Sequence, residues 1–213
     1  MSVERDDRAG AGSRATTLLL CLLAGLAAMG AATVASPQLP APVQTPPVVR
    51  VESGELQGVV DDGVASFKGI PFAAPPVGDL RWRPPQPAAP WTGVRQAAEF
   101  GADCMQGRFG PPPAPGAPPA RVASEDCLFL NVWRPASATS GAKLPVMVWI
   151  QGGMFELSST AAYDGSRFAR DGVVCVVINW RPGAEGFLYL DDGIANLGLL
   201  DQVAALQWVQ TNI

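Results

Sequence analysis

Two stretches of the sequence are apolar at nearly every position instead of at every second one. Residues 144–150 read Leu-Pro-Val-Met-Val-Trp-Ile, and residues 172–180 contain the run Val-Val-Cys-Val-Val-Ile. Because side chains alternate between the two faces of a strand, such runs predict strands that are covered on both faces. A helical pattern follows each strand, at 166–171 and at 196–213. This alternation predicts an α/β fold around a central sheet.

The residues before these strands predict an antiparallel β-meander that leads into the central sheet. Apolar and β-branched residues mark its strands, and Asp61-Asp62-Gly63 marks a turn. The proline-rich residues 71–92 predict a loop. A few core strands and one long helix would leave a sheet edge uncovered, so residues 48–213 are expected to be the N-terminal portion of a larger domain. The predicted early strands are 48–51, 55–60, 64–70 and 128–133.

Residues 1–35 have the character of a cleavable signal peptide. Arginines precede the apolar stretch 18–26, and small residues follow it up to Ala35, after which cleavage is expected. The mature protein is then predicted to be secreted, without insertion into a membrane. The alternative is an uncleaved membrane anchor, since residues 18–35 are nearly long enough to span a bilayer. Residues 36–47 form a proline-rich spacer.

The charge balance and the lack of histidine restrict the chemistry of the chain. The net charge is −4 and the basic residues form no cluster, so nucleic acid is not an expected partner. No histidine occurs among the 213 residues, which excludes a histidine base within them and removes the commonest metal ligand. The sequence shows neither metal-ligand spacing nor a phosphate-binding loop, so no metal and no cofactor are predicted.

The cysteines predict one disulfide bond. Cys21 would be lost with the signal peptide, and Cys175 lies inside an apolar run, where it is expected to be a buried small hydrophobe. This leaves Cys104 and Cys127 as the pair, in a protein whose export would permit oxidation. The loop that they close contains the proline-rich residues 111–119, which can form neither a helix nor a strand ladder.

The strand at 144–150 runs directly into Gly152-Gly153. Glycines at the end of a strand allow successive backbone N–H groups to point into one cavity, and a ligand can approach that backbone closely. Two such donors can bind the oxyanion of a tetrahedral intermediate. The same dipeptide is also typical of a plain turn, so the motif alone leaves both interpretations open.

Several blocks of the sequence, in order, resemble the type-B carboxylesterase and cholinesterase family, from about Val51 to Ile213. The most specific block is Ser124–Pro135, SEDCLFLNVWRP, which is similar to the family's "EDCL" signature. The other blocks are FKGIPFAAPPVGDLRW at 67–82, PWTGV at 90–94, PVMVWIQGG at 145–153, the segment 177–188 and the segment 196–213.

The resemblance implies an α/β-hydrolase fold and hydrolysis of small carboxylic esters through a Ser–Glu/Asp–His triad and an acyl-enzyme. The pair Cys104–Cys127 matches the first disulfide of the family. In relatives, the segment that begins at Gly152 supplies the oxyanion donors, which here would be the N–H groups of Gly153 and Met154. Phe155 follows this segment directly and is the candidate for an aromatic side chain that lines the pocket.

The sequence departs from the family pattern at several positions. Gln151 replaces a frequent His or Tyr, and Met154 replaces a third glycine, so that its side chain would narrow the pocket. No Gly-x-Ser-x-Gly nucleophile motif occurs in these residues. Ser158 and Ser159 follow the glycines but lie in no such motif. The chain by itself is therefore expected to be inactive, and a non-catalytic binding or adhesion protein of the same fold is the alternative function.

Overall fold

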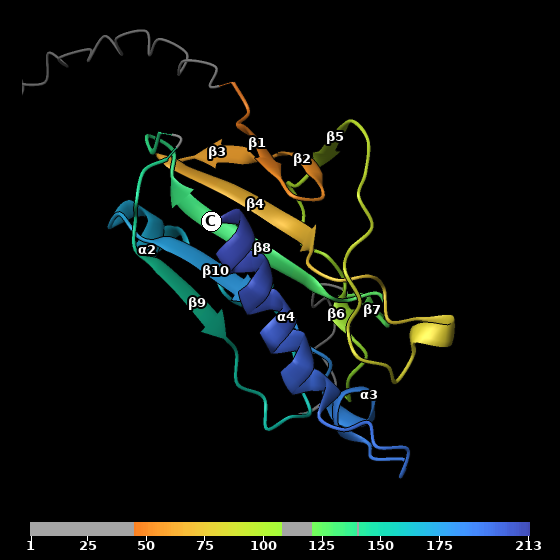
Figure 1. Cartoon of the computed structure of the whole chain (residues 1–213). Coiled ribbons are helices and arrows are strands. Elements are labelled where there is room, and N and C mark those ends of the chain that lie inside the picture. The colour runs from red at the N-terminus through yellow and green to blue at the C-terminus, as the bar shows by residue number, and fades with distance from the viewer. Residues whose placement is uncertain (1–44, 108–120, 140) are drawn as a thin grey trace, which may run out of the picture. The chain divides into compact units, whose positions relative to one another are not determined.

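The computed structural model describes residues 45–107, 121–139 and 141–213, and its main element is a mixed five-stranded sheet (Figure 1). The strand order is β3-β4-β8-β10-β9, in which β10 and β9 are parallel and the other neighbours are antiparallel. The predicted signal peptide and most of the spacer lie outside the described residues. The strands are β3 Val59–Asp61, β4 Val64–Pro71, β8 Phe129–Pro135, β9 Val146–Ile150 and β10 Val174–Ile178.

The antiparallel N-terminal strands divide between two sheets instead of forming one meander. The predicted strand 55–60 is interrupted at Gly58, whose N–H donates to the carbonyl of Pro47. A side chain at Gly58 would collide with the backbone of Ser66 and with the ring of Phe67, so the chain crosses closely over β4 at this point. The smaller sheets comprise β1 Val48–Val51, β2 Gly54–Gln57 and β5 Val94–Gln96, and then β6 Asp103–Cys104 with β7 Ala123–Ser124.

Helix α4 packs on one face of the central sheet and helix α2 on the other. Ala205 and Trp208 of α4 join the core cluster that contains Val176 and Ile178 of β10. Ala169 of α2 belongs to a second cluster, with Cys175 and Val177 of the same strand. The helices predicted at 166–171 and 196–213 are thus confirmed, whereas α3 and the short 3-10 helix η1 were not predicted. The helices are η1 Gly78–Leu80, α2 Ser166–Arg170, α3 Gly183–Phe187 and α4 Leu197–Asn212.

The two apolar strands differ in how they are covered. Strand β10 is buried at every position, as the prediction of two-sided coverage requires. Strand β9 is the edge of the described sheet, and Val146, Trp149 and Ile150 remain between 41% and 45% exposed. The expectation that both strands are covered on both faces is therefore correct for β10 and wrong for β9 in this structure. Burial also raises the pKa of the Cys175 thiol to about 11, which makes this cysteine unreactive.

None of the helices in the described part of the chain combines the length and the apolar character that a crossing of the bilayer requires. The apolar residues 18–35, on which the alternative of a membrane anchor rests, are outside that part.

A buried ion pair joins the end of β10 to α4. The guanidinium of Arg181 donates to both carboxylate oxygens of Asp201, from Nε at 2.8 Å and from Nη2 at 2.7 Å, and the backbone N–H of Arg181 donates to the same carboxylate at 3.0 Å. Burial raises the pKa of Asp201, and these three hydrogen bonds oppose that shift. Asp201 therefore has a structural role.

We expect Asp201→Ala to lower the free energy of unfolding by about 3–5 kcal/mol, because it leaves the guanidinium of Arg181 buried without a counter-charge. Asp192→Ala is the control, since Asp192 forms an exposed pair with Arg83 at 3.4 Å, and it should cost less than about 1 kcal/mol. Urea unfolding followed by tryptophan fluorescence measures both values. Equal losses for the two variants would contradict the assignment.

Candidate functional site

The candidate site lies at the carboxyl edge of the two parallel strands. The arrows of β9 and β10 point the same way in Figure 1, and α3 lies beyond their ends. Gln151 directly follows β9, and Trp180 comes two residues after the end of β10. The carboxyl ends of parallel strands are the usual place for ligands in α/β sheets. The Gly152-Gly153 segment therefore lies at the edge of the sheet where ligands usually bind.

The segment after β9 forms a tight turn with two residues in the left-handed region. The carbonyl of Gly153 accepts hydrogen bonds from the N–H groups of Glu156 at 2.9 Å and Leu157 at 3.0 Å. Met154 has a φ of 53° and Phe155 a φ of 61°. This conformation is costly for residues with a side chain, of the order of 1–3 kcal/mol each. Met154 therefore occupies a position that would suit glycine, in agreement with its departure from the family pattern.

The backbone N–H groups of Gly152, Gly153 and Met154 donate to no acceptor among the described residues. The side chain of Met154 is 74% exposed, so the turn lies at the surface of the described structure. Backbone donors that remain free at the end of a strand are available to an anionic oxygen. The structure thus brings the predicted oxyanion residues into one turn, and their role in binding an oxyanion stays a prediction.

The two glycines of the segment have different surroundings. A Cβ atom at Gly152 would meet no other atom within 4 Å. A Cβ atom at Gly153 would collide with the carbonyl oxygen of Leu157 and would also meet the Leu157 Cβ at 2.9 Å. Gly153 is therefore required by the close approach of the backbone within the turn, whereas Gly152 is not required by packing.

Ser158 is buried, with only 1% of its surface exposed. Its Oγ accepts hydrogen bonds from the side-chain amide of Gln151 at 2.8 Å and from the backbone N–H of Trp180 at 3.2 Å. An ester could not reach this hydroxyl, so Ser158 is not a nucleophile. Its hydrogen bonds to Gln151 and Trp180 connect the ends of β9 and β10. Gln151, which departs from the family pattern, is likewise buried and takes part in this connection.

The segment around the disulfide bond also contacts this turn. Cys104 and Cys127 are bonded with their Cα atoms 4.9 Å apart, in the pairing that the sequence predicts. Ser159 donates from its hydroxyl to Asp103 at 2.8 Å. Gln106 pairs with the peptide groups of Ser158, donating to its carbonyl and accepting from its N–H, both at 3.0 Å. Gln106 was not predicted from the sequence, although its position two residues after a disulfide cysteine was a usable signal.

Phe155 packs with two other aromatic side chains. Its ring centroid lies 5.0 Å from that of Phe187 and 6.3 Å from that of Trp180, and both pairs are edge-to-face. The carbonyl of Phe155 accepts a hydrogen bond from the N–H of Gly183 at 2.6 Å. The side chain is still 59% exposed. One part of the ring is therefore an anchor for the turn, and the remainder is free to contact a ligand.

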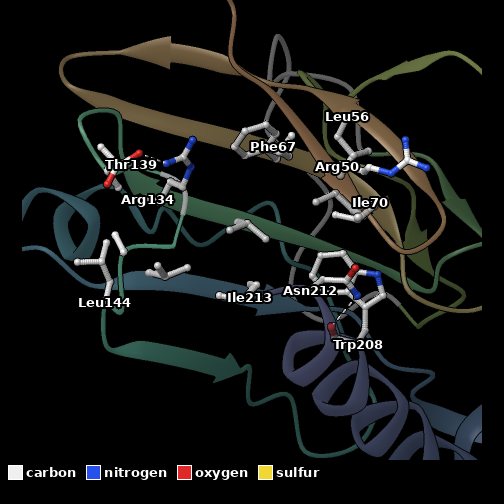
Figure 2. Close-up of a pocket in the computed structure, with 16 residues that line it drawn as sticks. Arg50, Leu56, Phe67, Ile70, Arg134, Thr139, Leu144, Trp208, Asn212 and Ile213 are labelled. Atoms are coloured by element: carbon white, nitrogen blue, oxygen red, sulfur yellow. Dashed lines mark hydrogen bonds between the residues drawn. The ribbon is translucent and has the colours of Figure 1, made fainter.

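Two hollows differ in their relation to the turn. An open hollow beside it is lined by Gln106, Glu156 and residues 183–185, together with Met105 and Gly107. An apolar cavity of about 170 Å³ lies at the C-terminal end of α4, among side chains of β1, β2, β4 and β8 (Figure 2). No residue between 151 and 160 lines this cavity. The hollow that contains Glu156 is therefore the one that belongs to the candidate site.

The mixed central sheet, with a helix on each face, is consistent with part of an α/β-hydrolase fold. The sequence profile of the Carboxylesterase family matches residues 45–213. The chain therefore belongs to the carboxylesterase family.

Two relatives show how much of a family member this chain represents. It is 46% identical to the fumonisin B1 esterase of Sphingopyxis macrogoltabida, over 82% of this chain and 34% of that protein. It is 43% identical to the cocaine esterase of Oryctolagus cuniculus, over 78% of this chain and 34% of that protein. The chain spans about a third of the length of these relatives.

Solved structures show the same correspondence. A PNB esterase superposes with a TM-score of 0.68 at 42% identity and covers 79% of this chain and 35% of its own. A carboxylesterase of Geobacillus stearothermophilus superposes with a TM-score of 0.67 at 45% identity, over 78% of this chain and 35% of its own. The α/β-hydrolase fold predicted from the sequence is therefore confirmed.

We expect Gly153→Ala to lower the free energy of unfolding by about 1–3 kcal/mol, because the added methyl group collides with the Leu157 carbonyl. Gly152→Ala is the matched control, and it should change stability by less than about 0.5 kcal/mol, since its Cβ points into open space. Chemical denaturation of the two variants beside the parent chain measures the difference. A Gly152→Ala variant that loses as much stability as Gly153→Ala would show the turn to be built differently.

Proposed function

We propose that this chain supplies the oxyanion-binding part of a serine-type carboxylic ester hydrolase that works through an acyl-enzyme. The observation that supports it is the set of free N–H groups at Gly152, Gly153 and Met154, at the carboxyl edge of β9. In an α/β-hydrolase, backbone N–H groups in such a glycine-rich segment form part of the oxyanion hole. The names of the relatives extend this to esters of small molecules as substrates.

In the proposed reaction, the histidine of the triad takes the proton of the serine hydroxyl as the serine oxygen bonds to the ester carbonyl carbon, and the carbonyl oxygen becomes an oxyanion. When the carbonyl re-forms, the bond to the alcohol oxygen breaks and the histidine returns the proton to the leaving alcohol. The N–H groups of Gly153 and Met154 donate to the oxyanion, and they stabilise the transition state more than the ground state because the charge develops during the attack. Removal of one such donor typically costs about 10²–10³-fold in kcat. The Ser–Glu/Asp–His triad is not among these residues, because the sequence has no histidine and no Gly-x-Ser-x-Gly.

The 213 residues alone should hydrolyse no p-nitrophenyl acetate above the buffer rate, and a fluorophosphonate should label no serine. The reason is that a serine nucleophile needs an adjacent base. Ser158 is buried, and the hydroxyl of Ser159 donates to Asp103. A spectrophotometric assay and intact mass measure the two outcomes. Stoichiometric labelling of the folded chain would contradict this expectation.

A chimera tests the function itself. Residues 45–213 would replace the matching N-terminal part of the Sphingopyxis fumonisin B1 esterase, to which they are 46% identical. We expect the folded chimera to hydrolyse p-nitrophenyl acetate, and Gly153→Ala to lower its kcat by about 10²-fold, because the turn that holds the donors is displaced. A chimera with a native circular-dichroism spectrum and no hydrolysis would favour the non-catalytic binding function instead.

Met154 should limit the size of the ester that the chimera accepts. Its side chain stands beside the free amides, at the position where the sequence departs from the third glycine of the family pattern. We expect Met154→Gly to raise the ratio of kcat/KM for p-nitrophenyl octanoate over p-nitrophenyl acetate by about tenfold, which is the usual effect of a change in pocket size. The acetate is the internal control, since a small acyl group leaves the side chain uncontacted. An unchanged ratio would place Met154 outside the pocket.

Export of the protein is part of the same proposal. Cleavage after Ala35 would release a mature chain that begins with the proline-rich spacer. The disulfide between Cys104 and Cys127 supports an oxidising compartment, because such bonds persist mainly outside the cytosol.

A further inference from the structure

Gln106 holds Ser158 by a pair of hydrogen bonds that mimics the pairing of two strands. Its Nε2 donates to the Ser158 carbonyl and its Oε1 accepts from the Ser158 N–H, both at 3.0 Å. The two residues are 52 positions apart in the sequence. Both hydrogen-bonding groups of the Gln106 amide are thus used on a single residue, and that residue follows the turn with the free amides.

Ser158 receives two further hydrogen bonds at its hydroxyl, from Gln151 and from the backbone of Trp180. Gln151 begins the turn and Ser158 ends it, so their contact closes the segment at a separation of seven residues. Four hydrogen bonds therefore fix Ser158, and two of them come from Gln106. A displacement of Ser158 would change the end point of the whole turn.

The turn needs external support because its own conformation is unfavourable. Met154 and Phe155 both have a positive φ, and such residues persist only where the surroundings hold them in place. Within the turn, the Gly153 carbonyl accepts from Glu156 and Leu157, while the N–H groups of Gly152, Gly153 and Met154 contribute no hydrogen bond among the described residues. The contacts at Ser158 are therefore a large part of what determines where these N–H groups point.

The segment 103–106, which carries Gln106, is anchored by a disulfide bond and by contacts of Asp103. Cys104, two residues before it, is buried and disulfide-bonded to Cys127. Asp103 accepts the Ser159 hydroxyl hydrogen bond at 2.8 Å and lies 3.4 Å from the guanidinium of Arg121. The segment 103–106 thus contacts both Ser158 and Ser159 while a covalent bond anchors its middle.

We propose that Gln106 is a positioning residue for the oxyanion donors, which it holds in place through the peptide groups of Ser158. The inference rests on the proposed function, under which these N–H groups bind an oxyanion. The contact between Gln106 and Ser158 does not depend on that function. Gln106 does not touch a reacting atom in this assignment. It supplies the rigidity that keeps the N–H groups of Gly153 and Met154 aimed at one point, and such preorganisation is what makes an oxyanion hole effective.

The test is nuclear magnetic resonance relaxation of the ¹⁵N-labelled 213-residue chain. Gln106→Met keeps the length of the side chain and removes both hydrogen bonds, while Gln106→Glu keeps the acceptor for the Ser158 N–H and removes the donor. Gln96→Met is the control, because the Gln96 side chain is exposed and bonds only to Gln57 at 3.3 Å. Backbone order parameters are read at Gly153 and Met154, and at Val132 and Val176 in the core.

In Gln106→Met, the order parameters of Gly153 and Met154 should fall from about 0.85 to below about 0.6, with those of Val132 and Val176 unchanged. Hydrogen exchange of the Leu157 amide should rise about tenfold, since the bond to Gly153 opens more often. Gln106→Glu should restore part of the order, and Gln96→Met should match the parent. A turn that stays rigid in Gln106→Met, or one that loosens only together with the core, would overturn the proposal.

The two proposals can fail separately. A loosened turn in Gln106→Met together with a folded but inactive chimera would reject the esterase function and keep the positioning role. An active chimera with a rigid turn in Gln106→Met would reject the positioning role and keep the function.

Discussion

The burial of β10 on both faces is the constraint on which the other elements depend. Alternate side chains of this strand enter two different clusters, with Val176 toward α4 and Cys175 toward α2. Burial of a side chain of this size contributes about 1.5–3 kcal/mol, so a strand buried throughout needs a cover on each side. Beyond the end of this strand, Trp180 donates to Ser158 and Arg181 forms the buried pair with Asp201, so one strand supports both the core and the site.

The site combines a strained turn with a set of contacts that hold it. Two consecutive residues in the left-handed region cost on the order of 1–3 kcal/mol each. Hydrogen bonds from Gln106, Gln151 and Trp180 converge on Ser158, and each contributes about 0.5–1.5 kcal/mol. The cost and the compensation are of similar size. The turn can therefore keep these N–H groups free of internal hydrogen bonds, which is what binding of an oxyanion would require.

The sequence predicted the bounds of two apolar segments well. The helix of α4 and the strand β10 were both predicted to within two residues at each end, because a long pattern leaves few alternatives. The N-terminal meander was predicted less well, since the passage of Gly58 over β4 separates strands that are adjacent in sequence. The prediction that β9 is covered on both faces was wrong for a similar reason. An apolar run shows that a strand prefers burial, but the neighbours of that strand depend on the sheet order.

The sequence by itself determined that an apolar strand is followed by Gly152-Gly153 and that Cys104 pairs with Cys127, because the apolar run, turn chemistry and the elimination of other cysteines are local or countable properties. Only the tertiary structure decided that Ser158 is a buried connector and not a nucleophile, and that Gln106 holds it. These roles depend on hydrogen bonds between residues 52 positions apart. The local sequence around a glutamine does not show whether its side chain faces water or bonds to a distant peptide group. Only the tertiary packing decides between these two environments.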